Sequence, residues 1–151
     1  MRVAVFGLAA LVALGAARAE APLNSGGAAP AAVSVAPVFR SDRTAADQPI
    51  RLPGGDVEVV VSRYTIPPGA KLPVHKHPHP RYAYVEAGTL RVSSADGARS
   101  TLYRPGDFIV EMVDTWHFGA AEGAEAVKLL VIDQIPPGAG ATVLRSTDKA
   151  Q

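Results

Sequence analysis

The stretch Gly69–Leu90 reads GAKLPVHKHPHPRYAYVEAGTL and holds three of the four histidines in the chain. Residues two apart on a strand point to the same face of the sheet. His75 and His77 can therefore present two imidazoles side by side, which suits two neighbouring positions around a metal ion. Prolines stand on both sides of His79 and break the alternation, so the direction of its side chain is left open.

On both sides of this stretch, short runs rich in Val, Ile, Tyr, Thr and Phe alternate with turns that contain Gly and Pro. Such runs are typical of half-buried strands. They predict strands at Asp56–Ile66, Leu72–His77, Tyr82–Glu86, Thr89–Ser94, Arg99–Arg104, Phe108–Met112, Trp116–Ala120 and Ala124–Ile135, with a further candidate at 141–145. Asp96-Gly97 predicts a tight hairpin turn. Many short strands with regular turns favour an all-β sandwich or barrel.

The first nineteen residues have the pattern of a secretory signal peptide. Arg2 gives a positive start, Val3–Ala17 is uninterrupted and apolar, and Ala17-Arg18-Ala19 fits an A-x-A cleavage site. An uncleaved N-terminal anchor is the alternative, but the run is too short to span a bilayer. We therefore expect a mature, periplasmic or secreted protein that begins at Glu20. Residues 20–37 are predicted to be a flexible Ala/Pro-rich lead-in and residues 38–151 a single domain.

The composition excludes several classes of function. Loss of residues 1–19 lowers Lys plus Arg from 15 to 13 against 14 Asp plus Glu, and no basic run suggests nucleic acid binding. The chain has no cysteine, which excludes disulfides, thiolate ligands and thiol catalysis. Neither a Gly-rich phosphate loop nor a G-x-S-x-G motif is present, and the mature chain has no apolar run long enough to span a membrane.

Two motifs resemble those of the cupin family. In the first, Gly69 is followed by five residues and then by His75-Lys76-His77, and the run continues through Tyr84–Leu90. The second opens with Pro105-Gly106-Asp107 and ends at a single histidine, which His117 matches in spacing. The resemblance covers about residues 57 to 135.

This resemblance implies a double-stranded β-helix, or jelly-roll barrel, with one metal ion inside it. The ligands that it implies are His75, His77 and His117, and the cofactor would be a divalent transition metal such as Fe, Mn, Ni, Cu or Zn. A metal-free barrel that keeps these histidines for hydrogen bonds is the alternative. His79 would offer a fourth nitrogen if it faced inward, but a place at the rim in solvent is favoured.

Two positions depart from the family pattern. The family's third ligand is a glutamate four residues after the second histidine, and here that position is Arg81. Strand parity from His77 places Arg81 on the pocket side, where its planar fork would bind the carboxylate of a substrate. An exposed surface cation is the alternative for Arg81. The second departure is Met112-Val113-Asp114, which replaces a Pro-x-Gly turn.

Other side chains near the motifs are expected to have structural roles. Glu111 and Asp114 are the only acids near the second motif, and we expect both at the surface. Tyr82, Tyr84 and Trp116 are expected to pack, because aromatic side chains commonly fill such barrels.

A barrel of this kind hosts unrelated activities, so its fold does not decide its function. Three neutral imidazoles leave coordination positions open for substrate and oxygen. The expected function is a metal-dependent, dioxygenase-like enzyme for a small anionic or phenolic compound. A non-catalytic module that binds or senses a small molecule or a metal is the alternative, and an isomerase is a third candidate. We also expect a homodimer, in which Val33–Arg40 adds a strand to the neighbouring sheet.

Overall fold

The computed structural model describes residues 32–146. The predicted signal peptide at 1–19, its cleavage site and most of the predicted lead-in at 20–37 lie outside the described residues. Residues 32–40 are exposed and form no strand within the single chain, so the strand that Val33–Arg40 would add to a neighbour stays a prediction. No helix with the length and apolar character of a membrane span occurs in the described range.

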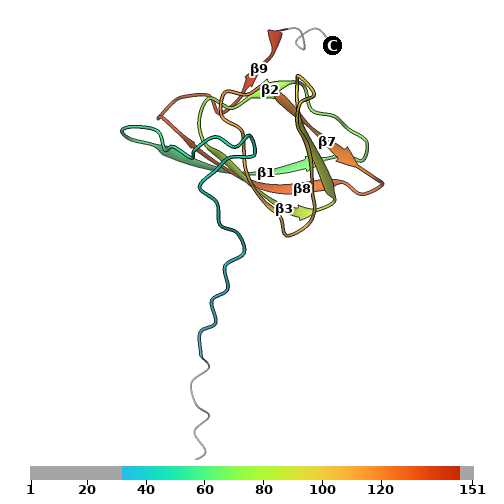
Figure 1. Ribbon diagram of the computed structural model, residues 1–151, viewed down its shortest axis with the longest axis horizontal. Helices are drawn as coiled ribbons and strands as arrows, with labels where there is room; N and C mark the ends of the chain where they lie inside the picture. Colours follow the sequence, from blue (N-terminus) through green and yellow to red (C-terminus); the bar gives the residue numbers. More distant parts are fainter. Residues whose placement is uncertain (1–31, 147–151) are drawn as a thin grey trace, which may run out of the picture. The chain divides into compact units, whose positions relative to one another are not determined.

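Residues 32–146 contain nine strands and no α-helix (Figure 1). The strands are β1 (Glu58–Ile66), β2 (His75–Lys76), β3 (Arg81–Ala87), β4 (Thr89–Ser94), β5 (Ser100–Tyr103), β6 (Phe108–Val110), β7 (His117–Glu122), β8 (Val127–Ile135) and β9 (Val143–Leu144). Each strand predicted from the sequence is confirmed, including the last candidate. β2 is shorter than expected because prolines flank it, and proline has no N–H to donate to a ladder.

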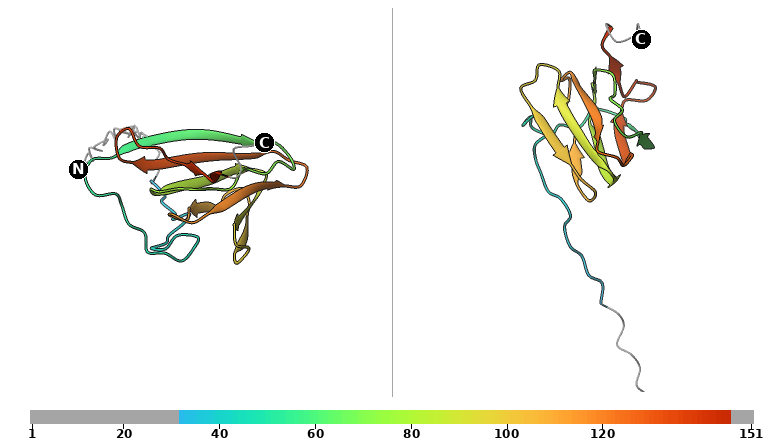
Figure 2. Two further views of the ribbon diagram at one scale, coloured as in Figure 1. Left: turned by 90° about the horizontal axis from the view of Figure 1, so that it is seen from above. Right: turned by 90° about the vertical axis from the view of Figure 1, so that its right-hand side faces the viewer.

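The strands form two antiparallel sheets that pack face to face (Figure 2). One sheet has the order β1-β8-β3-β6 and the other has the order β5-β4-β7-β2-β9. In β8 every second residue is buried, as in Val127, Leu129 and Val131, because one face of the strand meets the core. Each such apolar side chain contributes about 1.5–3 kcal/mol when it is fully buried.

Two of the turns between strands contain a glycine with a positive φ. Between β4 and β5, Asp96-Gly97 forms the expected tight turn, where Ser94 Oγ and Ala98 N both donate to Asp96 Oδ1. Between β3 and β4, Gly88 has a φ of 72°, and a Cβ there would lie 2.6 Å from the carbonyl oxygen of Ala126. Only glycine fits this position, because a side chain would meet the backbone beside β8.

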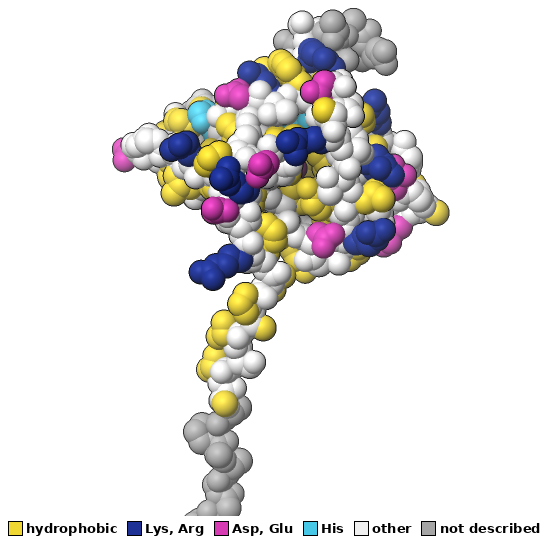
Figure 3. Space-filling view, in the orientation of Figure 1, with side chains coloured by type: hydrophobic (Ala, Val, Ile, Leu, Met, Phe, Trp, Pro, Cys, Tyr) yellow, Lys and Arg dark blue, Asp and Glu magenta, His cyan; other side chains and the backbone are white. Residues whose placement is uncertain are grey.

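The face of the molecule in Figure 3 carries Lys and Arg side chains interspersed with Asp and Glu. This mixture of signs does not form a basic stripe on that face, as a nucleic acid footprint would require.

Candidate metal centre

The structure brings the three predicted ligands together inside the barrel. His75 in β2 and His117 at the start of β7 are register partners, and His77 follows β2 and bridges to Val113. One ring nitrogen from each histidine lies within 4.8 Å of the other two, and all three side chains are buried. The pairing of β2 with β7 therefore brings His117 next to His75 and His77, although His117 lies 40 residues after His77 in the sequence.

A backbone carbonyl holds the Nδ1 atom of each of these rings. Because a carbonyl oxygen only accepts, each Nδ1 carries the hydrogen and donates it. Each Nε2 is then left with a lone pair, which is the tautomer that binds a metal. The contacts are His75 to Pro73 O at 2.7 Å, His117 to Thr115 O at 2.7 Å and His77 to Ala141 O at 3.0 Å.

Burial keeps the three imidazoles neutral. It lowers the pKa of His75 and of His117, and it lowers the pKa of His77 to about 2, where the nearby charge of Arg81 acts in the same direction. A metal ligand must be neutral imidazole, so the donor set fits a divalent transition metal. Metal binding itself stays a prediction. His79 is only half-buried and does not belong to this cluster.

Arg81 lies on the pocket side, as strand parity predicts, and its side chain is buried. The anion beside it belongs to the chain itself: Nε and Nη2 of Arg81 donate to the two carboxylate oxygens of Asp133, at 2.6 and 3.0 Å. Burial opposes the charge, but the hydrogen bonds and charge of Asp133 outweigh it and raise the pKa of Arg81. A role for Arg81 in substrate binding stays a prediction.

The expectation that Glu111 lies at the surface is wrong. Its side chain is buried in the cavity that the three histidines line, and burial raises the pKa of its carboxyl group. The reason is strand parity: Ile109 in β6 faces the core, and Glu111 is two residues further along. The backbone N–H of Glu111 donates to Arg81 O at 2.9 Å, which continues the pairing of β6 with β3.

Asp114, in contrast, lies at the surface as expected. Its side chain is 61% exposed and forms an ion pair with Lys76 at 2.9 Å. Asp114 has a φ of 49° at the position where the family motif has glycine, and aspartate is one of the residues that tolerate this left-handed conformation. The Met112-Val113-Asp114 replacement therefore keeps the turn that leads into His117.

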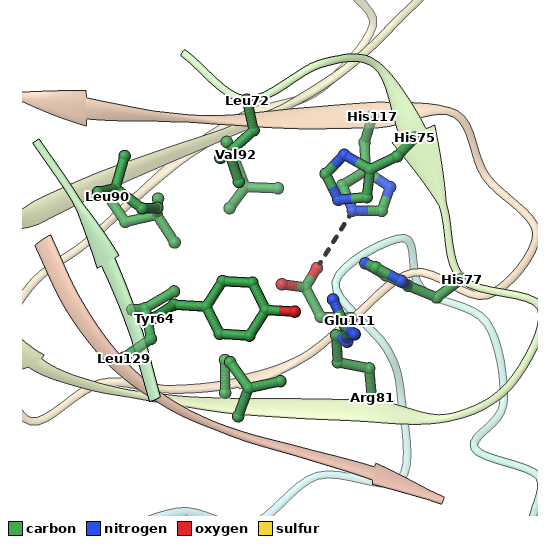
Figure 4. A pocket seen from close by; sticks show the side chains of 14 residues that line it. Tyr64, Leu72, His75, His77, Arg81, Leu90, Val92, Glu111, His117 and Leu129 are labelled. Atoms are coloured by element: carbon green, nitrogen blue, oxygen red, sulfur yellow. Dashed lines mark ion pairs between the residues drawn. The ribbon is translucent and has the colours of Figure 1, made fainter. Parts of the chain in front are cut away.

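The three aromatic residues that were expected to pack do not line the cavity of the histidines. Tyr82 stacks on Phe108, and Trp116 lies beneath Lys76 and Arg145. The structure instead brings in Tyr64, whose hydroxyl points toward the polar end of the cavity (Figure 4). Alternation along β1 was the signal for this residue, because Tyr64 shares the inward parity of Ile66.

The space around the site has two parts. The inner cavity of about 40 Å³ has a polar end of histidine, Arg81 and Glu111, and apolar walls that include Leu72, Leu90 and Val92 (Figure 4). An outer chamber of about 180 Å³ shares Leu72, Arg81 and further residues with it and is bordered by Leu144 of β9. Both spaces are smaller than the roughly 300–1,000 Å³ of typical drug-sized ligand sites.

Comparisons with known proteins identify the domain. Residues 62–133 match the family model described as "Cupin domain". A cupin-like protein from Thermotoga maritima superposes with a TM-score of 0.51 at 20% identity, over 58% of this chain and 64% of that chain. The polyketide cyclase RemF from Streptomyces resistomycificus superposes with a TM-score of 0.50 at 22% identity, over 63% of this chain and 66% of that chain.

At these identities, the likeness to solved structures shows a shared fold, and the match spans just under two thirds of either relative. No curated protein gives a significant match to the sequence. The family match covers both histidine motifs and the strands that carry them. Residues 62–133 of this chain therefore form a cupin domain.

Proposed function

We propose that this protein is a dioxygenase-like metalloenzyme that holds one divalent transition metal on His75, His77 and His117. Its substrate would be a small anionic or phenolic compound. The observation that carries the proposal is the convergence of three buried, neutral imidazoles whose Nδ1 atoms are each held by a backbone carbonyl. From the signal peptide pattern, we also propose that the mature protein acts in the periplasm or outside the cell.

A divalent transition metal supplies Lewis acidity at such a site and, when it is redox-active, electron transfer with dioxygen. The residues of the chain orient the ligands and limit the access of water. The carbonyl contacts fix the ring orientations before a metal binds, so little reorganisation is required. The apolar walls formed by Leu72, Leu90 and Val92 limit the access of water and strengthen electrostatic contacts at the polar end.

Arg81 supports the choice of an anionic substrate. Its Nε and Nη2 are used by Asp133, and Nη1 has no hydrogen-bond partner among the described residues. A carboxylate or phenolate in the outer chamber would find this nitrogen at the entrance to the histidine cluster, since Arg81 lines both spaces. Tyr64 lines both spaces as well and offers a second donor.

One observation favours the second candidate, a non-catalytic module that captures a metal or a small molecule. The inner cavity of about 40 Å³ is a few times the roughly 10–15 Å³ that one water molecule requires. It therefore has room for an ion and a few small groups, and a larger ligand would occupy the outer chamber. The enzyme requires the metal site and turnover, whereas the module binds a metal or a small molecule without turnover.

Metal analysis and oxygen uptake separate the candidates. The mature protein would be purified without chelators, its metal content measured by mass spectrometry, and oxygen consumption followed with a panel of small carboxylates and phenols. We expect about one metal per chain and turnover with at least one compound, with His117→Ala as the inactive control. Tight binding of a compound without oxygen consumption would instead establish the binding module. Absence of stoichiometric metal after reconstitution would contradict the metalloenzyme and the metal-binding module.

A further inference from the structure

Glu111 has a carboxylate oxygen that the fold leaves without a partner. Its Oε2 atom is buried and accepts no hydrogen bond within residues 32–146. Buried side-chain oxygens are nearly always hydrogen-bonded, so one that is not calls for a ligand that completes it. The guanidinium of Arg81 lines the same cavity, but it makes no hydrogen bond to this oxygen.

The atom that faces this oxygen is itself a metal donor. Oε2 of Glu111 lies 3.7 Å from Nε2 of His117 (Figure 4). This distance is too long for a hydrogen bond. Because Nδ1 of His117 carries the hydrogen that it donates to Thr115 O, Nε2 offers a lone pair and not a proton. Two electron-pair donors thus face each other across a gap that a metal ion can fill.

The gap has the right width for a metal ion. Two bonds of about 2.1 Å each, the usual length to imidazole nitrogen or carboxylate oxygen, can join atoms up to about 4.2 Å apart. The separation of 3.7 Å falls within this limit, and it is shorter than the 4.8 Å within which the three ring nitrogens lie. An ion between these two atoms is therefore within reach of both. Glu111 is not in the group whose ligand atoms all lie within 4.8 Å of one another, so its carboxylate would shift toward His75 and His77 to share an ion with all three histidines.

The sheet explains how a carboxylate reaches this position. Tyr82 and Val110 are register partners, and Glu111 N donates to Arg81 O, so Arg81 and Glu111 are cross-strand neighbours. Side chains at such positions lie about 4.5–5.5 Å apart on one face of the sheet. A carboxylate at 111 thus projects into the same cavity as a side chain at 81.

We propose that Glu111 is the fourth protein ligand of the metal, so that the site consists of three imidazoles and one carboxylate. This inference rests on the proposed metal site at His75, His77 and His117. The carboxylate would remove one unit of the ion's positive charge inside the barrel, which three neutral imidazoles cannot do. A mixed imidazole and carboxylate set suits Fe²⁺ and Mn²⁺, and it leaves fewer positions for substrate than a site of histidines alone.

Titration of the metal-free mature protein with Co²⁺ tests this assignment without any activity assay. Visible absorption would report the ligand set, and calorimetry would report affinity and stoichiometry. We expect Glu111→Gln, which keeps the shape of the side chain, to weaken Co²⁺ binding by about 100-fold and to change the absorption bands. Asp114→Asn is the matched control, because it removes the other acid of the same loop, and it should leave both readouts unchanged.

A second variant separates loss of the ligand from a general folding defect. Glu111→Asp keeps the charge but shortens the reach, and we expect an affinity between those of the unchanged protein and Glu111→Gln. Equal affinity and identical spectra in the unchanged protein, Glu111→Gln and Glu111→Asp would overturn the role of Glu111 while leaving the histidine site intact. Failure of the unchanged protein to bind Co²⁺ would instead contradict the proposed metal site.

Discussion

The buried pair of Arg81 and Asp133 predicts a large loss of stability when one member is removed. The two side chains form two hydrogen bonds at 2.6 and 3.0 Å, and they are only 8% and 5% exposed. In Asp133→Leu the guanidinium would remain in the barrel without the carboxylate that pairs with it. Removing one partner of a buried pair costs about 3–5 kcal/mol, because the remaining charge is neither solvated nor compensated.

This loss is a large part of the total stability, which for a domain is about 5–15 kcal/mol. At roughly 2–4 °C per kcal/mol, the melting temperature should fall by roughly 10 °C. Replacing both members, as in Arg81→Met with Asp133→Leu, should restore most of the stability, since apolar side chains of similar volume remove the charge as well as its partner.

Urea unfolding of the metal-free protein, followed by the fluorescence of the single tryptophan, would measure these differences. Glu86→Ala is the control, because Glu86 pairs with Arg63 at the surface and should contribute at most about 1 kcal/mol. The reasoning is refuted if Asp133→Leu destabilises the protein no more than this control. It is equally refuted if the double replacement is no more stable than Asp133→Leu.

Three further outcomes are expected. Replacing His117 by Ala should abolish stoichiometric metal, whereas His79→Ala should retain it; elemental analysis checks this, and full retention in His117→Ala would contradict the site. Burial lowers the pKa of the three clustered histidines from an ordinary value of 6.5, so the unfolded chain takes up protons that the folded chain refuses. Metal-free stability should therefore be full above about pH 6.5 and fall as the pH is lowered. Urea unfolding midpoints measured between pH 8 and pH 5 test this dependence. The Glu111→Gln variant is best suited, because the raised pKa of Glu111 changes the stability in the opposite direction. A rise in stability toward acid pH in this variant would contradict the prediction. Mass spectrometry of protein from the native host should find a chain that begins at Glu20, and an intact Met1 in soluble protein would argue against export.

Much of the fold could be predicted because its signals are local. Alternating Val, Ile and Tyr residues mark the strands, and turn residues such as Asp96-Gly97 mark where one strand ends and the next begins. The same alternation places His75 and His77 on one face of a strand. Tyr64 and Glu111 face inward for the same reason, because they share the parity of Ile66 and Ile109.

The sequence by itself determined the strands, the turns and the presence of two histidines on one face of a strand, since each depends on residues close together in the chain. Only the tertiary structure decided which charges meet. Asp133 is 52 residues from Arg81, and they pair because β8 lies beside β3 in the sheet. Glu111 joins the histidines because β6 lies on the other side of β3. Strand order is a property of the packed sheets, set by burial of their apolar faces, so no local pattern at 81 or 111 could reveal it.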